Sequence, residues 1–368
     1  MMRRLHRAGI AGLLSAALFH QPLAAQTPAA NGDVPWQVPA TTLVERQEMT
    51  FENAGVRLSG TLYAPRGAKG APAVVAFHGA GGPSQHLALY RHLTELLPPL
   101  GIAVFLFDRR GSGKSGGTHR SSDYDLLADD GIAAAAMLAR DPRIDAKRIG
   151  FWGLSQGGWL SLLAATRRPG TPFAIAVSAP LTTPDVQMYA YVENMLTIAG
   201  YGRADIDAAV KVRRSVDDYF RGTIDRAAAE AVLAEGRDKP WFDLIYVNRT
   251  LGDPKTSAWP KDMKHDPMKV VEKLKAPSLI LFGTRDPVIP TAISVERLQP
   301  VLRSRRNVEM AVVAGADHAM SVSEPVKNQI DPKRLDSLKP DSAEYFARLA
   351  DWLARQGLTA RGALARDQ

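Results

Sequence analysis

A serine flanked by glycines stands where a strand-like segment ends and a helix-like segment begins. Gly153-Leu154-Ser155-Gln156-Gly157 follows the apolar run 148–152 and precedes the leucine- and alanine-rich run 158–166. The first run is typical of a buried strand and the second of a helix. Glycine lets a backbone turn sharply and approach other groups closely. The feature therefore constrains the fold, because it requires a strand that leads directly into a helix.

The same spacing occurs a second time, in Gly113-Lys114-Ser115-Gly116-Gly117. Ser115 lies well beyond the apolar run 102–107, and the residues after it are typical of a loop. We therefore expect Ser155, and not Ser115, to occupy a strand-to-helix turn. The alternative for Ser155 is an ordinary turn serine.

Strand-like and helix-like runs alternate along most of the chain. The runs 43–51 and 56–63 predict an antiparallel hairpin. Further strands are predicted at 73–77, 102–107, 149–152, 173–178, 278–282 and 308–313. Helices are predicted at 88–97, 123–139, 157–167, 291–302 and 342–356. This order predicts an α/β fold with a doubly wound, mostly parallel sheet and an antiparallel start.

One connection is much longer than a crossover needs, because about 100 residues separate Ser178 from Ser278. Helix-like runs at 208–220 and 225–234 predict a helical cap at 181–272, inserted into a sheet domain formed by 41–180 and 273–358. The insertion carries many large side chains: Met188, Tyr189, Tyr191, Tyr201, Trp241, Phe242, Tyr246 and Trp259. We expect most of them to form the cap's own core and a few to line a pocket.

The start of the chain has a different composition from the rest. Three arginines in the first seven residues precede the apolar run 8–19, and Leu23-Ala24-Ala25 supplies small residues for cleavage. This order predicts a secretory signal peptide at 1–25 and a linker at 26–40. A retained membrane anchor is the alternative, although the apolar run is short for a stable span. We expect a bacterial protein that is periplasmic or secreted.

Composition narrows the possible chemistry. The chain has no cysteine, which excludes disulfides, thiolate metal sites and a cysteine nucleophile. Its net charge of +8 is spread along the chain without a basic stripe, so we expect no nucleic-acid partner. The residues imply no metal and no organic cofactor. The expected partner is a small molecule with an apolar portion.

A serine hydroxyl needs a general base to act as a nucleophile at neutral pH. On this architecture the acid and the histidine follow the serine in the sequence, and His265 and His318 do so. His318 comes directly after the last predicted strand, so it should reach the carboxyl edge of the sheet beside Ser155. His265 ends the predicted cap, where a helix-capping or surface role is expected. We expect His318 to be the base.

Three aspartates compete to orient the imidazole of His318. Asp286 follows the preceding predicted strand and should emerge at the same edge of the sheet. Asp317 would need a local reversal to reach the adjacent ring, and Asp266 is the weakest of the three. We expect Asp286 to be the acid; the alternative is that it caps the helix from Thr291.

The oxyanion of a tetrahedral intermediate needs preorganised N–H donors. The first expected donor is the backbone N–H of Gln156, at the start of the helix. The second should come from the loop His78-Gly79-Ala80-Gly81-Gly82, which follows a predicted strand. Ala80 is the expected donor and Gly79 the alternative, while His78 is expected to brace the loop.

The segment Asp108-Arg109-Arg110-Gly111-Ser112-Gly113-Lys114-Ser115 is similar to a phosphate-binding loop only in its last three residues. The motif G-x-x-x-x-G-K-[ST] requires a glycine where the chain has Asp108, and no helix is predicted to start at Lys114. We expect a structural turn beside the site and no nucleotide.

Taken together, these motifs resemble the α/β-hydrolase superfamily over residues 43–356, with the cap only loosely comparable. The Ser155 turn, the His78 loop, the Asp108 segment, Gly283-Thr284-Arg285-Asp286 and Asp317-His318 look like those of dienelactone-hydrolase-like and prolyl-oligopeptidase-like serine esterases. The resemblance implies an α/β-hydrolase fold and the same triad of Ser155, Asp286 and His318. The chain differs from dienelactone hydrolases proper, which carry cysteine at the turn, and from haloalkane dehalogenases, which carry aspartate.

The expected activity is that of an exported serine hydrolase of the carboxylesterase type, which works through an acyl-enzyme. An amidase or serine peptidase with the same triad is the alternative, and acidic residues in the cap that bind a substrate amine would favour it. A non-catalytic binding protein on this fold is less favoured, because the triad is complete in the sequence. A carbon–carbon or cyanohydrin lyase has no positive sign in the sequence.

Overall fold

The computed structural model describes residues 44–81, 84–118, 123–331, 333–334 and 337–360. All of them belong to one compact unit, Pro35–Gln368. The predicted signal peptide at 1–25 and linker at 26–40 lie outside the described residues.

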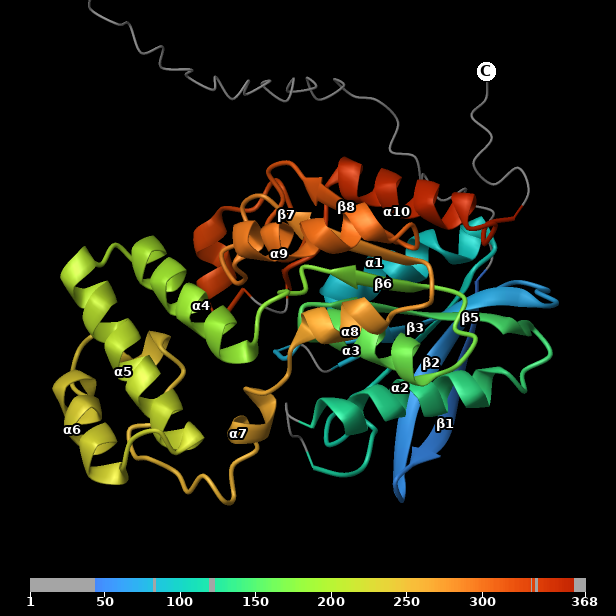
Figure 1. Ribbon diagram of the computed structural model, residues 1–368. Coiled ribbons are helices and arrows are strands. Elements are labelled where there is room, and N and C mark those ends of the chain that lie inside the picture. Colours follow the sequence, from blue (N-terminus) through green and yellow to red (C-terminus); the bar gives the residue numbers. More distant parts are fainter. Residues whose placement is uncertain (1–43, 82–83, 119–122, 332, 335–336, 361–368) are drawn as a thin grey trace, which may run out of the picture. The chain divides into compact units, whose positions relative to one another are not determined.

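An eight-stranded sheet organises the chain, with the strand order β1-β2-β4-β3-β5-β6-β7-β8 (Figure 1). β1 pairs with β2 and β2 with β4 in antiparallel register, and all other neighbours pair in parallel. The strands are β1 (Val44–Asn53), β2 (Val56–Pro65), β3 (Ala71–Phe77), β4 (Ala103–Phe107), β5 (Ile144–Leu154), β6 (Ala174–Val177), β7 (Ser278–Gly283) and β8 (Val308–Val313). The predicted fold class, with its antiparallel hairpin at the start, is confirmed.

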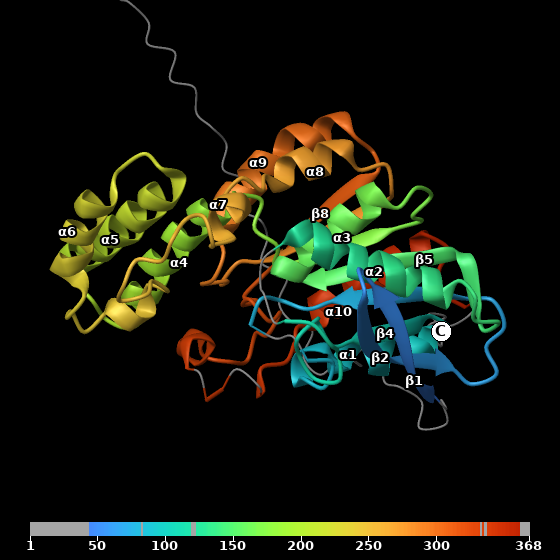
Figure 2. The same cartoon turned by 90° about the horizontal axis from the view of Figure 1, so that it is seen from below.

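Helices cover both faces of the sheet (Figure 2). One face carries α2 (Tyr124–Leu138), α3 (Gln156–Arg167), α8 (Pro267–Lys273) and α9 (Thr291–Ser304), and the other carries α1 (Ala88–Leu96) and α10 (Ala343–Arg355). Within β3, Val75 and Phe77 belong to the first core, whereas Val74 and Ala76 belong to the second. This two-sided burial explains why the central strands are continuously apolar.

The long insertion between β6 and β7 is helical. It contains α4 (Pro184–Ile198), α5 (Arg203–Arg221), α6 (Arg226–Gly236) and α7 (Trp259–Asp262), and it ends in α8. α4, α5 and α6 lie side by side and share a separate apolar core that includes Val192, Val212, Leu233 and Trp241 (Figure 1). α8 instead packs against α3 and α9, so the end of the insertion contacts helices of the sheet domain.

The parallel strands β3, β5, β7 and β8 all end at the same edge of the sheet. Ala80, Asp286 and His318 lie on loops that follow these strands, while Ser155 and Gln156 lie where β5 leads directly into α3. Among the residues that the structure describes, no helix is both long enough and apolar enough to span a bilayer.

Candidate active site

Ser155 occupies a sharp turn between the end of β5 and the start of α3. Its backbone has φ +57° and ψ −122°, a conformation that non-glycine residues rarely adopt. Its N–H donates to the carbonyl of Val177 in the neighbouring strand, 2.8 Å away. The turn is therefore held from the sheet side, and the serine precedes the N-terminus of α3, which favours negative charge.

The close packing around this turn requires glycine at two positions. A Cβ atom at Gly153 would lie 1.9 Å from the carbonyl oxygen of Gly157. A Cβ atom at Gly157 would lie 2.3 Å from the carbonyl oxygen of Phe77, at the end of β3. The G-x-S-x-G spacing thus lets β5, α3 and the end of β3 meet around Ser155.

His318 and Asp286 meet at the same edge of the sheet. The Nδ1 atom of His318 lies 2.8 Å from Oδ2 of Asp286, and the carboxylate side chain is fully buried. The second oxygen of Asp286 accepts the N–H groups of Val288 and Ile289 at 2.8 and 3.2 Å. These backbone bonds fix the carboxylate, which in turn orients the imidazole. Asp286 does not cap α9, which begins after Pro290.

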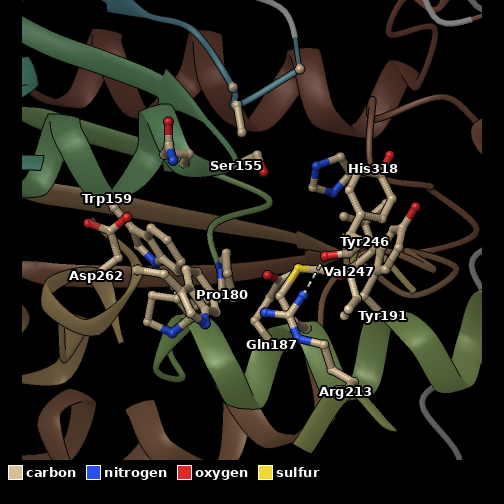
Figure 3. A pocket seen from close by; sticks show the side chains of 18 of the residues that line it. Ser155, Trp159, Pro180, Gln187, Tyr191, Arg213, Tyr246, Val247, Asp262 and His318 are labelled. Atoms are coloured by element: carbon tan, nitrogen blue, oxygen red, sulfur yellow. Dashed lines mark hydrogen bonds between the residues drawn. The ribbon is translucent and has the colours of Figure 1, made fainter. Parts of the chain in front are cut away.

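The charge of Asp286 also changes the protonation of His318. Burial lowers the pKa of His318, but the carboxylate and its hydrogen bond outweigh burial, so the net pKa is raised above the ordinary value of 6.5. When Nδ1 of a neutral His318 carries the hydrogen and donates it to Asp286, Nε2 is left as a basic nitrogen. Ser155 and His318 project into the same cavity (Figure 3).

The other two aspartates have structural partners. One oxygen of Asp317 accepts the N–H groups of Ala319 and Ser321, and the other accepts from the side chain of Gln329 at 2.6 Å. Burial raises the pKa of Asp317 to about 6. Asp266 accepts the N–H of Met268 and so caps α8. Neither side chain bonds the imidazole.

The loop after β3 passes close to the serine. A Cβ atom at Gly79 would lie 3.6 Å from Cβ of Ser155. The N–H of Gly79 donates to the hydroxyl of Tyr90 at 2.9 Å and is therefore occupied. Ala80 is exposed and lines the cavity, and in the described part of the chain its N–H has no acceptor. Of the two predicted alternatives for the loop, Ala80 is the donor that remains available. Gln156, the other predicted donor, opens α3.

Two buried side chains brace this loop. His78 hydrogen-bonds through Nε2 to the carbonyl of Phe107, and burial lowers its pKa to about 4, so the ring is neutral. Arg109 donates from Nη2 to the carbonyls of His78 and Gly79 at 2.9 and 3.3 Å. The guanidinium is almost fully buried and makes no ion pair among the described residues. Sequence reasoning did not identify Arg109 as a brace.

The neighbouring segment forms the expected structural turn. The carboxylate of Asp108 accepts the backbone N–H groups of Gln85 and Lys114, both at 3.0 Å. Ser115 is buried; its hydroxyl donates to the carbonyl of Asp108 and accepts the N–H of Ser59. The second G-x-S-x-G match is thus part of the packing beside the site and does not face the cavity.

The cavity has a volume of about 720 Å³ and is lined by both the sheet domain and the cap (Figure 3). Of the large cap residues singled out in the sequence, Met188, Tyr191, Tyr246 and Trp259 line it. Trp241 and Phe242 instead lie in the core of the cap, and Tyr201 packs against that core. Most of the wall is apolar, so the cavity suits a substrate with apolar parts.

Three charged residues also belong to the lining: Arg213, Asp217 and Asp262. Sequence reasoning found none of them, because charged helix residues usually face solvent. Burial raises the pKa of Asp262 to about 6. His265, which was expected at the surface or as a cap, is instead half-buried between Tyr124 and Trp159, with ring centroids 4.9 and 5.2 Å away. Among the described residues, no cluster of three or more possible ligands could hold a metal ion.

Comparisons with known families and structures agree with the fold described above. A family model described as serine aminopeptidase, S33 matches residues 68–217, which include the loop after β3 and the Ser155 turn. The structure is similar to that of the esterase Pf2001 of Pyrococcus furiosus, with a TM-score of 0.53, 21% identity, and coverage of 86% of this chain and 91% of that chain. This likeness shows a shared fold. The chain therefore has an α/β-hydrolase fold, and residues 68–217 match a hydrolase family model.

Two curated relatives share part of the sequence. A probable dipeptidyl-aminopeptidase B of Fusarium vanettenii is 34% identical over 117 residues, which are 29% of this chain and 13% of the fungal protein. A thiohydrolase of Aspergillus aculeatus is 34% identical over 112 residues, which are 30% of this chain and 34% of that protein. The chain thus spans well under half the length of either relative.

Proposed function

We propose that the chain is a serine hydrolase that cleaves carboxylic esters through an acyl-enzyme. Ser155 is the nucleophile, His318 the general base and Asp286 the residue that orients it. The backbone N–H groups of Gln156 and Ala80 bind the oxyanion. The observation that carries the proposal is the 2.8 Å contact between His318 and Asp286, in a cavity that Ser155 also lines.

The chemistry follows from these positions. Ser155 Oγ attacks the carbonyl carbon while Nε2 of His318 takes the hydroxyl proton, and the negative charge moves to the carbonyl oxygen. When the tetrahedral intermediate collapses, the bond to the alcohol breaks and His318 gives its proton to the departing oxygen. Water then attacks the acyl-enzyme with His318 again as base, which releases the acid and restores Ser155.

Ester rather than amide cleavage is supported by the apolar character of the cavity wall and by the names of two similar proteins, an esterase and a thiohydrolase. The resemblance to dienelactone-hydrolase-like and prolyl-oligopeptidase-like esterases agrees with this choice.

An aminopeptidase is the second candidate, and one observation favours it. Asp262 lines the cavity and has no basic partner among the described residues, whereas its neighbour Lys261 pairs with Asp123 at 2.9 Å. An ionised Asp262 would attract a substrate ammonium group. The names of the matching family and of one relative also point to aminopeptidases.

A p-nitrophenyl ester series from acetate to decanoate separates these candidates when it is run beside aminoacyl p-nitroanilides. We expect turnover of the esters, with an optimum acyl chain length that the size of the cavity sets. This turnover should be lost in Ser155→Ala. Turnover of the anilides alone would replace the esterase by the aminopeptidase. If neither series turns over faster than in Ser155→Ala, the enzyme proposal fails and a binding protein remains.

We also propose that the protein is exported to the periplasm or secreted after removal of residues 1–25. The three early arginines, the apolar run 8–19 and the small residues before Gln26 support this. Fractionation of a bacterial host and sequencing of the mature N-terminus test it. A cytoplasmic protein that retains Met1 would contradict it.

A further inference from the structure

Arg213 brings a permanent positive charge to the wall of a mostly apolar cavity. It lies on α5 of the cap, and only 5% of its surface is exposed. Among the described residues that line the cavity, it is the only arginine or lysine. Burying a guanidinium costs free energy unless hydrogen bonds and an opposite charge compensate it.

Three segments of the cap hold this guanidinium. Its Nε donates to Oδ2 of Asp217 at 3.0 Å, and its Nη1 donates to the carbonyl of Tyr246 at 3.1 Å. The indole ring of Trp259 lies against it, with 4.9 Å between the guanidinium carbon and the ring. The other oxygen of Asp217 accepts the indole N–H of Trp259 at 2.7 Å. The group is therefore fixed in one orientation before any ligand binds.

Among the described residues, the Nη2 nitrogen of Arg213 is left without an acceptor by this arrangement. Within the described residues, neither N–H of its Nη2 has an acceptor, whereas both oxygens of Asp217 are used. Figure 3 shows the guanidinium end of Arg213 turned toward the cavity, between Gln187 and the segment at Tyr246 and Val247. A charged donor that is nearly buried and faces a cavity is suited to an oxygen acceptor of a ligand.

The surrounding charges favour an uncharged acceptor over a carboxylate. Asp217 already neutralises Arg213, and Asp262 is the only other acidic residue in the described lining. With all three ionised, the wall carries one net negative charge. A bound carboxylate would add a second negative charge in a poorly hydrated space. A carbonyl oxygen accepts the same hydrogen bond without that penalty.

We propose that Arg213 Nη2 binds an uncharged carbonyl oxygen in the part of the substrate remote from the cleaved bond. The preferred substrates are thus esters whose apolar chain carries a second carbonyl group, enclosed by side chains such as Tyr191, Phe220 and Trp259. This inference rests on the proposed function, because it assigns the substrate to the same cavity as Ser155.

Matched esters test the inference. The first set is p-nitrophenyl octanoate, the same ester with a ketone at the penultimate chain carbon, and the same ester with a terminal carboxylate. The second set places the ketone in the alcohol part, as octyl acetate with and without it. We expect the ketone to raise kcat/KM roughly tenfold in one set, mainly by lowering KM. No ketone preference in either set, or a preference for the carboxylate, would overturn the inference.

Each variant is judged by the ratio of kcat/KM for the ketone ester to kcat/KM for the plain ester. Losses that are common to both substrates cancel in this ratio. Arg213→Lys keeps a positive charge beside Asp217 but has no second planar nitrogen, so the ketone preference should disappear. Arg214→Lys is the matched control: Arg214 is adjacent on α5, lies over the ring of Tyr189 and does not line the cavity. The ketone preference should persist in Arg214→Lys. Its persistence in Arg213→Lys would overturn the inference.

Two further variants keep the test decisive if Arg213→Lys misfolds or if the enzyme proposal fails. The double variant Arg213→Met, Asp217→Asn removes both charges together, so no carboxylate is left unpaired, and it should lose the same preference. Ser155→Ala should bind the ketone ester roughly tenfold more tightly than the plain ester, as measured by tryptophan fluorescence. Such binding without wild-type turnover would refute the esterase and keep the inference. Turnover without ketone preference would refute the inference alone.

Discussion

At the carboxyl edge of the sheet, each proposed catalytic group lies within a few residues of the end of a strand. Ser155 directly follows β5, Asp286 follows β7 and His318 follows β8. In the cap, the residues that line the cavity come from α4, α5, α7 and a long connecting segment, and they meet only because those elements pack together. The edge is therefore positioned by backbone geometry, whereas the cap is positioned by contacts between distant side chains.

This difference implies that the edge of the sheet determines the reaction and that the cap determines which substrate is preferred. Backbone N–H groups fix Asp286, and the buried side chain of Arg109 donates to the loop at Gly79, so the geometry at the edge does not depend on the substrate. The cavity wall in the cap is built from large apolar side chains with a few charges. Substitutions at the edge should reduce the rate for every substrate, and substitutions in the cap should change which substrate is preferred.

The largest effect is expected for Ser155→Ala, which should lower kcat by about 10⁶-fold, because no other group can form the acyl-enzyme. The matched control is Ser115→Ala, in the second G-x-S-x-G match. It should keep kcat and lose about 1 kcal/mol of stability with its hydrogen bonds. Steady-state kinetics and urea unfolding measure both. Equal losses of kcat in the two variants would remove the distinction between the two serines.

Asp286→Asn should lower kcat/KM by about 10⁴-fold and change its pH dependence. His318 acts as a base when neutral, and its pKa is raised above 6.5, so wild-type activity should fall as the pH drops through a value above 6.5. Without the carboxylate, burial remains and lowers the pKa of His318, so the fall should move to lower pH. Asp317→Asn is the control, and in this variant the midpoint of the pH–activity profile should stay above pH 6.5.

Arg109→Met should lower kcat by roughly 10–100-fold, because the loop that carries Ala80 loses the donor to its carbonyls. KM should change little, while the affinity for a boronic acid, which mimics the oxyanion, should fall with kcat. Arg109→Lys should restore part of both. A purely structural role for Arg109 would instead lower the melting temperature and leave the kcat of the folded protein unchanged.

The smallest effect is expected for Tyr246→Ala, at the cap side of the cavity. Tyr246 is 69% exposed, so stability should change by no more than about 0.5 kcal/mol. Its ring lines the cavity and lies 5.4 Å from that of Tyr191, so KM for long acyl chains should rise by a few fold. Short esters serve as the internal control. A uniform loss of kcat across chain lengths would contradict the division between edge and cap.

The same contrast explains what could be predicted from the sequence. The Ser155 turn, Asp286 and His318 each follow a mostly apolar predicted strand, so their place at one edge could be expected before the structure was known. The structure brings Asp286 to His318 and gives Asp317 other partners. The proposed catalytic roles stay predictions until they are measured.

Other features depend on packing that has no local pattern. α4 was not predicted, because it buries Val192 and Leu196 in the cap core while Met188 and Tyr191 face the cavity, which leaves no single apolar stripe. The role of Arg109 depends on β4 lying beside β3, which the order of strands along the chain does not reveal.

The central claim is that Ser155 forms the covalent intermediate, and a phosphonate ester that reacts irreversibly with activated serines tests it most directly. The account predicts one adduct by intact mass, located on the peptide that contains Ser155, absent in Ser155→Ala and slower to form in Asp286→Asn. No adduct on the folded wild-type protein, or an adduct on another residue that persists in Ser155→Ala, would contradict it.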